Sequence, residues 1–310
     1  MMKIIFFGLG SIGKQHARIL RDNFKHAIFA FRSDNNAKLS GLGIKEVYRW
    51  QEVRTIKPDI AFITNPTFLH IKTALKCADL GMHLFIEKPL SDSMDNILQL
   101  ERICRRNKLT CYTAYCLRFH PVIMKMREIL RGKPIYHARL VCSSYLPLWR
   151  KDKNWKKYYS VDKKQGGGVL LDLSHEFDYI SYIFGEIDKI SGVFSKVSNV
   201  TVDSEDFADI LIKLESSVHV NLHLNFFSRI NERSLKVDFP DGYLIGDLIN
   251  NKIEFYDKGK KQVINFTTSR QKVMREQLRY FFDHLGNVKI MNGIQESKKL
   301  LAKILEFKNG

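Results

Sequence analysis

The chain has 310 residues, of which 45% are hydrophobic and 27% are charged, and its formal net charge is +17. This composition excludes an intrinsically disordered chain, and the lack of any apolar run near the roughly 20 residues of a membrane span excludes a membrane-embedded one. The five cysteines form no C-x-x-C pair, which is typical of reduced thiols in the cytoplasm. We therefore expect a soluble cytoplasmic protein with one large domain or two modest ones.

The positive charge raises the question of a nucleic-acid partner. Basic patches drive binding to phosphates, but the lysines and arginines are spread along the chain, with one dense run at residues 150–157. No helix-turn-helix, zinc-finger or RNA-recognition signature accompanies them. A generally basic surface, or attraction of an anionic cofactor and substrate, explains the charge better. We expect neither a nucleic-acid partner nor a membrane partner.

The first predicted element is a short buried strand at residues 3–7, "KIIFF", followed at once by "GLGSIG" and a helical run, "KQHARILRDNF". A G-x-G-x-x-G fingerprint between a strand and a helix indicates a dinucleotide site. The first glycine allows a tight turn, the second lets the backbone approach a pyrophosphate, and the third lets helix and strand pack closely. N–H groups at the start of the helix face the anion. The expected cofactor contacts are Gly8, Leu9, Gly10, Ser11, Ile12 and Gly13.

The second strand, "HAIFAF", ends at Phe31, where an NAD enzyme usually presents an acid to the ribose 2′-hydroxyl. Arg32 and Ser33 follow, and a guanidinium with a hydroxyl can hold a 2′-phosphate. The sequence therefore favours NADP over NAD, with Arg32 and Ser33 as contacts. In the alternative interpretation, Arg32 only stacks on adenine and Asp34 serves the ribose of NAD.

Strands and helices alternate up to about residue 117, which predicts an α/β, doubly wound parallel sheet. The expected elements are strands 59–64, 82–87 and 110–115 and helices 68–81 and 93–108, the last capped by Ser91 or Ser93. Ligands of such folds bind at the carboxyl ends of the strands. Two tripeptides lie at such ends and are expected to face the cofactor: Thr64-Asn65-Pro66 and Glu87-Lys88-Pro89.

After residue 117 the periodicity changes, which predicts a second, α+β domain with a large, mainly antiparallel sheet. One buried helix (169–184) and two closing helices (about 271–285 and 293–308) accompany it. A hairpin turn, "LESSV", joins two of the strands. The expected strands are 135–146, 188–198, 206–214, 218–227, 234–240, 252–257 and 261–267.

One strand of this sheet, "VHVNLHLNF", carries a polar column. His219 and His223 share a face but would stand about 13 Å apart at ~3.3 Å per residue, too far to hold one metal ion. No other histidine or cysteine spacing fits a zinc site, so we expect no metal. We expect the column to form the surface of a homodimer or homotetramer: His219, Asn221, His223 and Asn225.

Between sheet and buried helix lies the segment 143–165, in which aromatic and basic residues alternate. Trp149 can stack on a sugar ring and Arg150 can meet an acidic group of the same molecule. The alternative is an exposed basic loop.

The stretch 166–178, "GGGVLLDLSHEFD", opens the buried helix. Helical projection places Leu170, Leu173, Phe177, Ile180 and Phe184 on one apolar stripe. The titratable residues lie on the opposite face: Asp172, His175, Glu176 and Tyr179. A histidine suits proton transfer to or from a hydroxyl, so we expect these four residues to meet a substrate. An ordinary solvated helix face is the alternative.

Together, "GLGSIGKQHARIL", "TNPTFLH", "GMHLFIEKPL", "RFHP" and "GGGVLLDLSHEFD" resemble the glucose–fructose oxidoreductase / inositol dehydrogenase / MocA family. The resemblance implies an N-terminal Rossmann domain, residues 1–117, and a C-terminal substrate and oligomerisation domain, residues 118–310. It also implies that Lys88 lies beside the nicotinamide and that Asp172 and His175 complete the catalytic site. Of the remaining motif residues, we expect His70 to contact the cofactor and Arg118 the substrate.

This sequence departs from the family in one place. Members usually space the helix pair as D-x-x-x-H, whereas Asp172 and His175 are one residue closer. Either His175 carries the proton through a shifted helix register, or Glu176 has taken that role.

The function implied is an NAD(P)-dependent oxidoreductase that transfers hydride to or from a hydroxyl or keto carbon of a sugar or sugar derivative. Segment 143–165 resembles a branch found with bacterial surface-sugar pathways, so the sugar can be acidic or nucleotide-linked. Two alternatives stay open. One is a redox-neutral enzyme with tightly held NAD that eliminates or hydrolyses, and the other is a ligand sensor without catalysis.

Overall fold

The computed structural model describes residues 1–32, 43–149, 162 and 165–310, so Ser33, Asp34 and Arg150 lie outside the described residues. The chain divides into two compact units, one formed by residues 1–114 and 274–301 and the other by residues 115–273 and 302–310.

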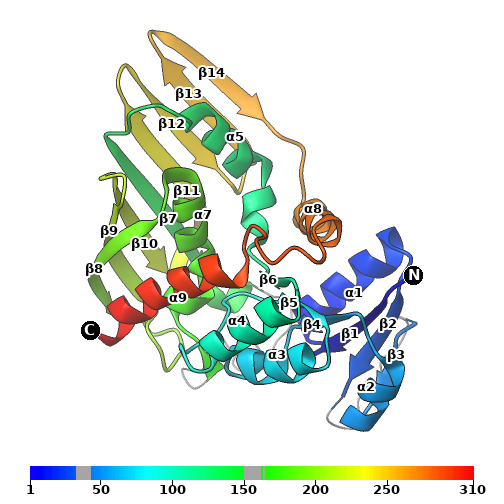
Figure 1. The fold of residues 1–310 in the computed structure, drawn as a ribbon. Coiled ribbons are helices and arrows are strands. Elements are labelled where there is room, and N and C mark those ends of the chain that lie inside the picture. Colours follow the sequence, from blue (N-terminus) through cyan, green and yellow to red (C-terminus); the bar gives the residue numbers. More distant parts are fainter. Residues whose placement is uncertain (33–42, 150–161, 163–164) are drawn as a thin grey trace. The chain divides into compact units, whose positions relative to one another are not determined.

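The first unit is built on a six-stranded, all-parallel sheet with the strand order β3-β2-β1-β4-β5-β6 (Figure 1). This order is typical of Rossmann folds, and the connection reverses direction between β1 and β4, where such folds bind nucleotides. The predicted doubly wound sheet is confirmed. The strands are β1 (Lys3–Phe7), β2 (Ala27–Phe31), β3 (Lys45–Val47), β4 (Ile60–Ile63), β5 (His83–Ile86) and β6 (Cys111–Thr113).

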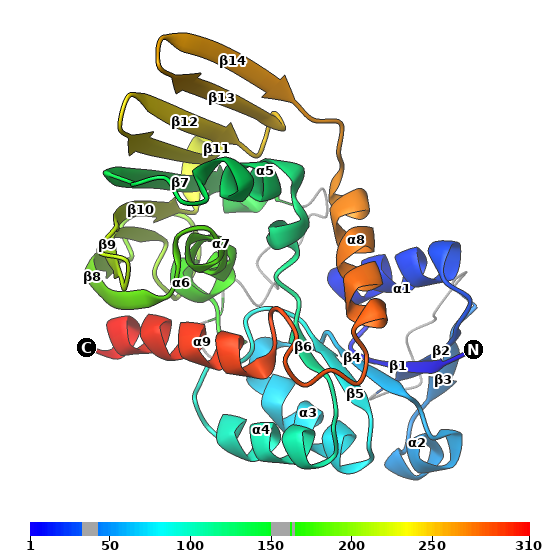
Figure 2. The same ribbon diagram turned by 45° about the horizontal axis from the view of Figure 1, so that its top comes forward.

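Helices cover both faces of this sheet, which is why its central strands β1 and β4 are apolar apart from Lys3 at the start of β1. In Figure 2, α1 (Ser11–Asn23) and α8 (Arg270–Asp283) lie on one side, and α3 (His70–Asp79) and α4 (Ile97–Arg106) on the other. Phe281 of α8 packs edge-on against the Phe85 ring, with 5.2 Å between centroids. Burying one such phenylalanine stabilises the fold by roughly 1.5–3 kcal/mol.

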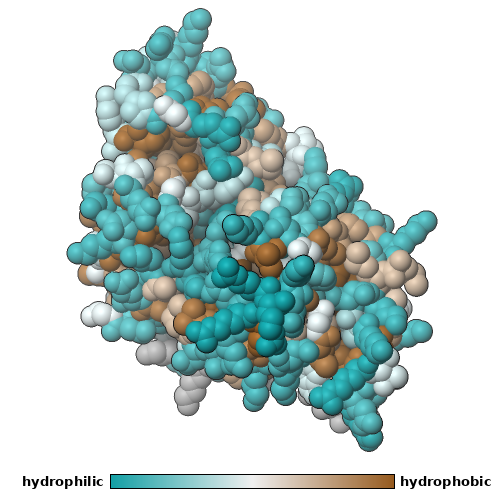
Figure 3. Space-filling model, viewed as in Figure 1, coloured by the Kyte–Doolittle hydropathy of each residue, from teal (hydrophilic) through white to brown (hydrophobic). Residues whose placement is uncertain are grey.

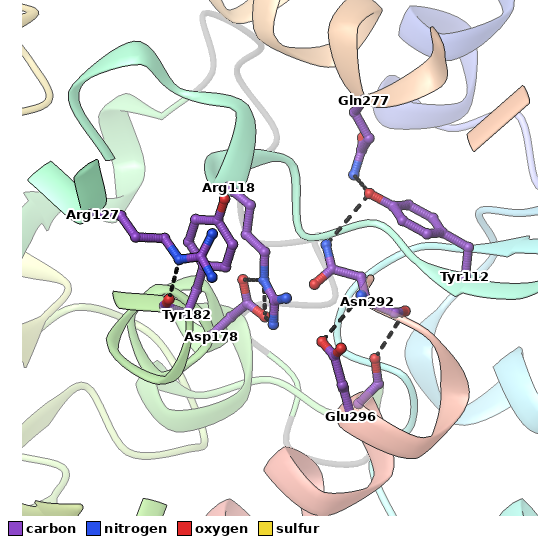
Figure 4. A network of polar contacts seen from close by, with 9 residues as sticks. Tyr112, Arg118, Arg127, Asp178, Tyr182, Gln277, Asn292 and Glu296 are labelled. Atoms are coloured by element: carbon purple, nitrogen blue, oxygen red, sulfur yellow. Dashed lines mark hydrogen bonds and ion pairs between the residues drawn. The ribbon is translucent and has the colours of Figure 1, made fainter. Parts of the chain in front are cut away.

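Within the first unit, a polar cluster joins the segment 274–301 to strand β6. The Tyr112 hydroxyl of β6 accepts hydrogen bonds from Gln277 of α8 at 3.2 Å and from the Asn292 amide at 3.4 Å (Figure 4). All three side chains are fully buried.

Local predictions failed at three places in the first unit. The helix predicted from 93 begins only at Ile97, because Asn96 takes a left-handed conformation (φ 60°), and the Ser93 hydroxyl instead accepts from the Asp95 N–H in a preceding turn. Strand β3 and helix α2 (Trp50–Ile56) were not predicted. Both are too short to show a clear period.

The second unit is built on an eight-stranded sheet with the order β14-β13-β12-β11-β7-β10-β9-β8. Every neighbouring pair is antiparallel except β7 and β10, which confirms the predicted large, mainly antiparallel sheet. The strands are β7 (His137–Tyr145), β8 (Ile187–Ser195), β9 (Phe207–Leu214), β10 (His219–Asn225), β11 (Phe227–Phe239), β12 (Gly242–Asp247), β13 (Lys252–Asp257) and β14 (Lys260–Asn265).

Two details of this sheet differ from prediction. Strand β12 was missed because Gly242 and Gly246 break its apolar pattern. Asn225 is buried and does not continue the exposed column of His219. Its side-chain oxygen instead accepts from the N–H groups that follow, Phe227 at 3.3 Å and Ser228 at 2.9 Å, because the chain turns there from β10 into β11.

The helix predicted at 169–184 is interrupted. It forms as α6 (Val169–Asp172) and α7 (Ser174–Phe184), with Leu173 between them at φ −94°, ψ 27°. The expected polar face is also wrong, since Asp172, Glu176 and Tyr179 are all buried. The helix is covered on this side as well, by the sheet and by the segment η2 (Cys116–Phe119) with α5 (Pro121–Leu130).

No helix within the described ranges is long and apolar enough to cross a membrane. On the face shown in Figure 3, hydrophilic side chains predominate and hydrophobic ones lie in small groups between them. The five cysteines are all free thiols.

Candidate active site

The glycine turn after β1 has the geometry that the fingerprint predicts. Gly8 has φ +101°, and a Cβ there would stand 2.5 Å from the Asn65 backbone nitrogen. A Cβ on Gly13 would collide with the Gly8 carbonyl and the Thr64 hydroxyl. Next to Gly10, by contrast, no atom of the described residues lies within 4 Å. The first and third glycines are therefore required by the protein itself, whereas the second borders open space.

Gly10 is also the N-cap of α1. Gly10 has no side chain to cap this helix, and the first turn of the helix holds no acidic residue. The N–H groups of the first turn therefore keep their hydrogen-bonding capacity and their partial positive charge for an anion. The open side of Gly10 and an uncapped helix start together fit a pyrophosphate.

The first strand-end tripeptide closes against this turn. The Thr64 hydroxyl donates to the Gly8 carbonyl, and the Asn65 amide donates to the Thr73 hydroxyl of α3 at 2.9 Å. The Asn65 side-chain oxygen is buried and has no hydrogen-bond partner among the described residues. Pro66 continues into the short helix η1 (Thr67–Leu69). The predicted residues of the two loops thus lie together at the carboxyl ends of β1 and β4.

The second tripeptide is held by a histidine that sequence reasoning missed. His16 of α1 is buried and its Nε2 lies 2.6 Å from Glu87 Oε1. Glu87 is therefore engaged by a neighbouring helix. Lys88 is half-buried, and the peptide bond to Pro89 is cis. A signal for His16 does exist in the sequence, since it falls three residues after Gly13 on the apolar side of α1.

His70 lies behind both loops instead of at their surface. Its Nδ1 is 3.0 Å from the Pro89 carbonyl and its Nε2 is 3.0 Å from the Asn65 carbonyl. Burial lowers the pKa of His70, although the two carbonyl contacts and the Glu87 charge act in the opposite direction. Because the ring is fully engaged and buried, His70 joins the two loops, and we no longer place it in contact with a cofactor.

At the end of β2, the side chain of Phe31 packs in an aromatic group with Phe7, at 5.4 Å, and Trp50, at 5.2 Å. Arg32 is half-exposed just beyond, and its backbone N–H donates to the Val47 carbonyl at 2.9 Å. Ser33, the second predicted phosphate contact, is outside the described residues.

In the second unit, the glycine run leads into α6 through Gly168, at φ +111°. A Cβ there would collide with the carboxylate of Glu205. Lys308 binds that carboxylate at 2.9 Å, and the Glu205 carbonyl accepts from the Val169 N–H at 3.1 Å. The glycine therefore allows the start of α6 to lie directly on a fixed carboxylate.

The interruption at Leu173 bears on the short D-x-x-H spacing. The Glu176 N–H donates to the Leu173 carbonyl at 3.1 Å, three residues back. Asp172 therefore ends α6, and His175 begins α7 on the other side of this tight turn. The His175 ring meets the Tyr115 ring edge-on at 5.6 Å. Burial, and then the Asp178 charge, raise the pKa of Tyr115, which keeps this phenol neutral.

Two residues expected to meet a substrate are inaccessible. Glu176 and Tyr179 are each 0% exposed. The Glu176 carboxylate is bound by Arg233 of β11 at 2.6 Å. We leave both side chains out of the candidate substrate site.

Arg118 is also engaged within the protein. Its guanidinium binds the Asp178 carboxylate at 2.8 and 3.0 Å and lies 5.0 Å from the centre of the Tyr182 ring (Figure 4). Arg118 and Asp178 are both buried. The partner of Arg118 in the structure is thus a carboxylate of α7. Neither Asp178 nor Arg233 was singled out from the sequence, because no local pattern marks them.

Trp149 follows the short helix η3 (Leu146–Leu148) and is 38% exposed. Its indole N–H donates to the Ser144 hydroxyl at 2.7 Å, and its ring meets Phe226 edge-on at 5.2 Å. An indole fixed at its edge and partly open suits stacking on a ring.

Within the parts of the chain that the structure describes, no three histidine, cysteine or acidic side chains are grouped as metal ligands would be. His223, considered above as a candidate ligand, pairs with Asp209 at 2.6 Å.

Two family profiles match the chain. Residues 2–115 match "Oxidoreductase family, NAD-binding Rossmann fold", and residues 123–245 match "GFO/IDH/MocA C-terminal domain". Together these matches cover most of both units.

Among individual proteins, a myo-inositol 2-dehydrogenase of Thermotoga maritima is 28% identical over 66% of this chain and 60% of its own length. A 2,7-anhydro-N-acetylneuraminate hydratase of Escherichia coli is 26% identical over 44% of this chain and 34% of its own length. The chain thus spans 60% or less of these relatives. The solved structure of a levoglucosan dehydrogenase in complex with NADH has the same fold, with a TM-score of 0.86 at 14% identity, covering 99% of this chain and 97% of that one.

Proposed function

The chain belongs to the GFO/IDH/MocA oxidoreductase family, and on that premise we propose that it transfers hydride between a nicotinamide dinucleotide and a hydroxyl or keto carbon of a sugar or sugar derivative. The observation that carries the proposal is the open side of Gly10 at the uncapped start of α1. No neighbour among the described residues requires that glycine, whereas a pyrophosphate approaching the backbone does. Such a dinucleotide, when bound, supplies the hydride acceptor or donor.

We propose that the pyrophosphate lies over Gly8, Gly10 and Gly13 and that NADP is preferred to NAD. The NADP preference rests on Arg32 at the end of β2, where its guanidinium can pair with a 2′-phosphate. Phe31 cannot hold a ribose hydroxyl, because a phenyl ring carries no carboxylate to accept its hydrogen bond, and its side chain packs against Phe7 and Trp50.

We propose His175 as the group that moves the proton, with Asp172 orienting its ring. The alternative, Glu176, is completely buried and ion-paired with Arg233, so it has no access to a substrate. Lys88 would stabilise the charge that develops on the substrate oxygen. Trp149 would stack on the sugar ring.

The substitutions Lys88→Met and His175→Asn test this proposal. Loss of an oxyanion-stabilising group costs about 10²–10³-fold in turnover, and loss of a general acid–base group about 10²–10⁴-fold. Both variants should still bind NADPH with unchanged affinity, measured by fluorescence titration. Steady-state rates are measured on free, carboxylated and nucleotide-linked sugars, and wild-type turnover by Lys88→Met would refute the mechanism.

The hydratase relative favours a second candidate function. Enzymes of this fold can oxidise a substrate transiently and then reduce it again, so that no net redox change occurs. Purified protein would then carry NAD that is never consumed, while the substrate changes. Chromatography would follow product formation while the nicotinamide absorbance is recorded. A constant absorbance during product formation would support this candidate over net oxidation or reduction.

We also propose a cytoplasmic homodimer or homotetramer formed through the eight-stranded sheet. Exposed polar side chains on that sheet, such as His219 and Asn221, support such a surface. Light scattering would measure the molar mass. A monomer at micromolar concentration would overturn the proposed oligomer.

A further inference from the structure

The residue that follows His175 is bound by an arginine from the middle of the sheet. Arg233 of β11 lies opposite Cys142 of β7, on the side of the sheet that carries α7. Its Nε and Nη2 each lie 2.6 Å from one oxygen, Oε1, of Glu176. The Glu176 side chain is 0% exposed and that of Arg233 is 24% exposed. Two guanidinium nitrogens on the same oxygen fix where that oxygen lies relative to β11.

The pair lies at the start of α7, where the N-cap residue, Leu173, makes no side-chain hydrogen bond. The interruption at Leu173 also separates α7 from α6. Glu176 lies in the first turn of α7, next to His175, so its bond to Arg233 ties this turn to the sheet. The end of the helix has other contacts, since Arg127 donates to the Tyr182 carbonyl at 2.9 Å.

Two groups beside the pair, a thiol and a phenol, are neutral. Burial, and then the nearby Glu176 charge, raise the pKa of the Cys142 thiol and of the Tyr179 hydroxyl. The buried negative charge of Glu176 is thus balanced by Arg233. A buried ion pair contributes little net stability compared with apolar residues of the same size. Packing alone therefore does not account for it, and what it supplies is a fixed direction.

We propose that Arg233 is a positioning residue for His175: through Glu176 it fixes the first turn of α7 and so the place of the proton-transferring ring. This rests on the proposed function of His175. Arg233 itself touches no reacting atom in this assignment.

The first measurement compares Arg233→Met with Arg127→Met. Both remove an arginine that binds α7, but Arg127 binds its last turn. We expect Arg233→Met to lower kcat at least tenfold, with KM changed less than threefold and the NADPH dissociation constant unchanged, whereas Arg127→Met keeps wild-type kcat. An equal loss in both variants, or a rise in KM without a fall in kcat, would overturn the assignment.

Combination with His175→Asn separates positioning from other effects. If Arg233 acts through His175, Arg233→Met lowers kcat no further in a His175→Asn background. Losses that multiply would contradict the proposal, because Arg233 would then act on something else. If His175→Asn alone has wild-type kcat, His175 is not the proton carrier. That result shows that the proposed function of His175 fails, independently of the role of Arg233.

Arg233→Met can fail to fold, because it leaves a buried carboxylate unbalanced. The double substitution Arg233→Met with Glu176→Leu removes both charges of the pair, and we expect it to melt near the wild-type temperature. Its kcat should nevertheless stay at least tenfold low, because the first turn of α7 is no longer directed. A double variant with wild-type melting temperature and wild-type kcat would show that the pair only balances charge.

Discussion

The two candidate half-sites are built on different principles. In the first unit, the cofactor turn is shaped by backbone, with Gly8, Gly10 and Gly13 placed by a strand and a helix that adjoin them in sequence. In the second unit, the helix that carries His175 is held by side chains far away in sequence. Glu176 and Arg233 are 57 residues apart, and Arg118 and Asp178 are 60 apart. A backbone site is sensitive to an added methyl group, and a site of this second kind to a lost charge.

The largest expected effect tests the second half-site. Arg118→Met leaves Asp178 buried without its guanidinium, which should lower the free energy of unfolding by about 3–5 kcal/mol. Replacing both residues, with Asp178→Leu added, should recover most of this loss, because no charge remains buried. Urea denaturation monitored by circular dichroism measures both variants. A single variant as stable as the wild type would mean that this pair does not hold α7.

The backbone site is tested by two glycines that differ in their surroundings. Gly8→Ala meets both a positive φ and the Asn65 backbone, which together cost roughly 2–4 kcal/mol. Gly10→Ala meets open space, so the free energy of unfolding should change by less than about 1 kcal/mol, while cofactor binding weakens. Thermal melting of the cofactor-free protein measures the change in stability, and titration with NADPH measures the change in cofactor binding, for both variants. If Gly10→Ala binds NADPH as well as the wild type does, the cofactor does not approach there.

His120 supplies a pH test in the second unit. Burial, together with the Arg233 charge, lowers its pKa from the ordinary 6.5 to about 4, against the hydrogen bond with Asn251. Its Nδ1 accepts from the Val122 N–H at 3.3 Å, which requires the neutral ring. Between pH 6.5 and 4, His120 is therefore protonated in the unfolded chain but neutral in the folded one. The contribution of His120 to stability is largest above pH 6.5.

As the pH falls from 6.5 towards 4, this group should lower the free energy of unfolding by about 3 kcal/mol. The substitution His120→Asn keeps an acceptor for the Val122 N–H but does not titrate, so its stability should fall less over the same range. Urea titrations at pH 4.5 and 7.5 on both proteins measure the difference. Parallel curves would contradict the buried neutral histidine.

The smallest expected effect concerns cofactor choice in the first unit. Arg32→Ala should narrow the preference for NADPH over NADH by about ten- to hundredfold, since a charge-assisted pair contributes roughly 1.5–3 kcal/mol. Lys76→Ala is the matched control. It also removes one positive charge, but from helix α3 instead of the end of β2, and Lys76 lies over the Trp50 ring at 5.2 Å. Fluorescence titration of the wild type and both variants with NADPH and NADH gives the six dissociation constants. A wild type that binds NADH as tightly as NADPH would show that no 2′-phosphate site exists.

From sequence alone, the strand–glycine–helix start, the parallel α/β order and the antiparallel second sheet were all predictable. These features depend on hydrophobic period and glycine placement within some twenty residues, and hydrogen bonds between neighbours in sequence enforce them. The same local reasoning missed β3 and β12 and placed the start of α4 at Ser91 or Ser93 instead of Asn96. In each case a short element or a single left-handed residue outweighed the average pattern.

Only the tertiary structure decided which titratable groups are engaged. Helical projection put Asp172, His175 and Glu176 on one exposed face, but the sheet covers Glu176 and supplies Arg233 to it. In the same way His16 reaches Glu87 across 71 residues of sequence. The physical reason is that a charge taken out of water must find a partner in space, and the partner's position in sequence depends on the topology of the sheet, which no local period records.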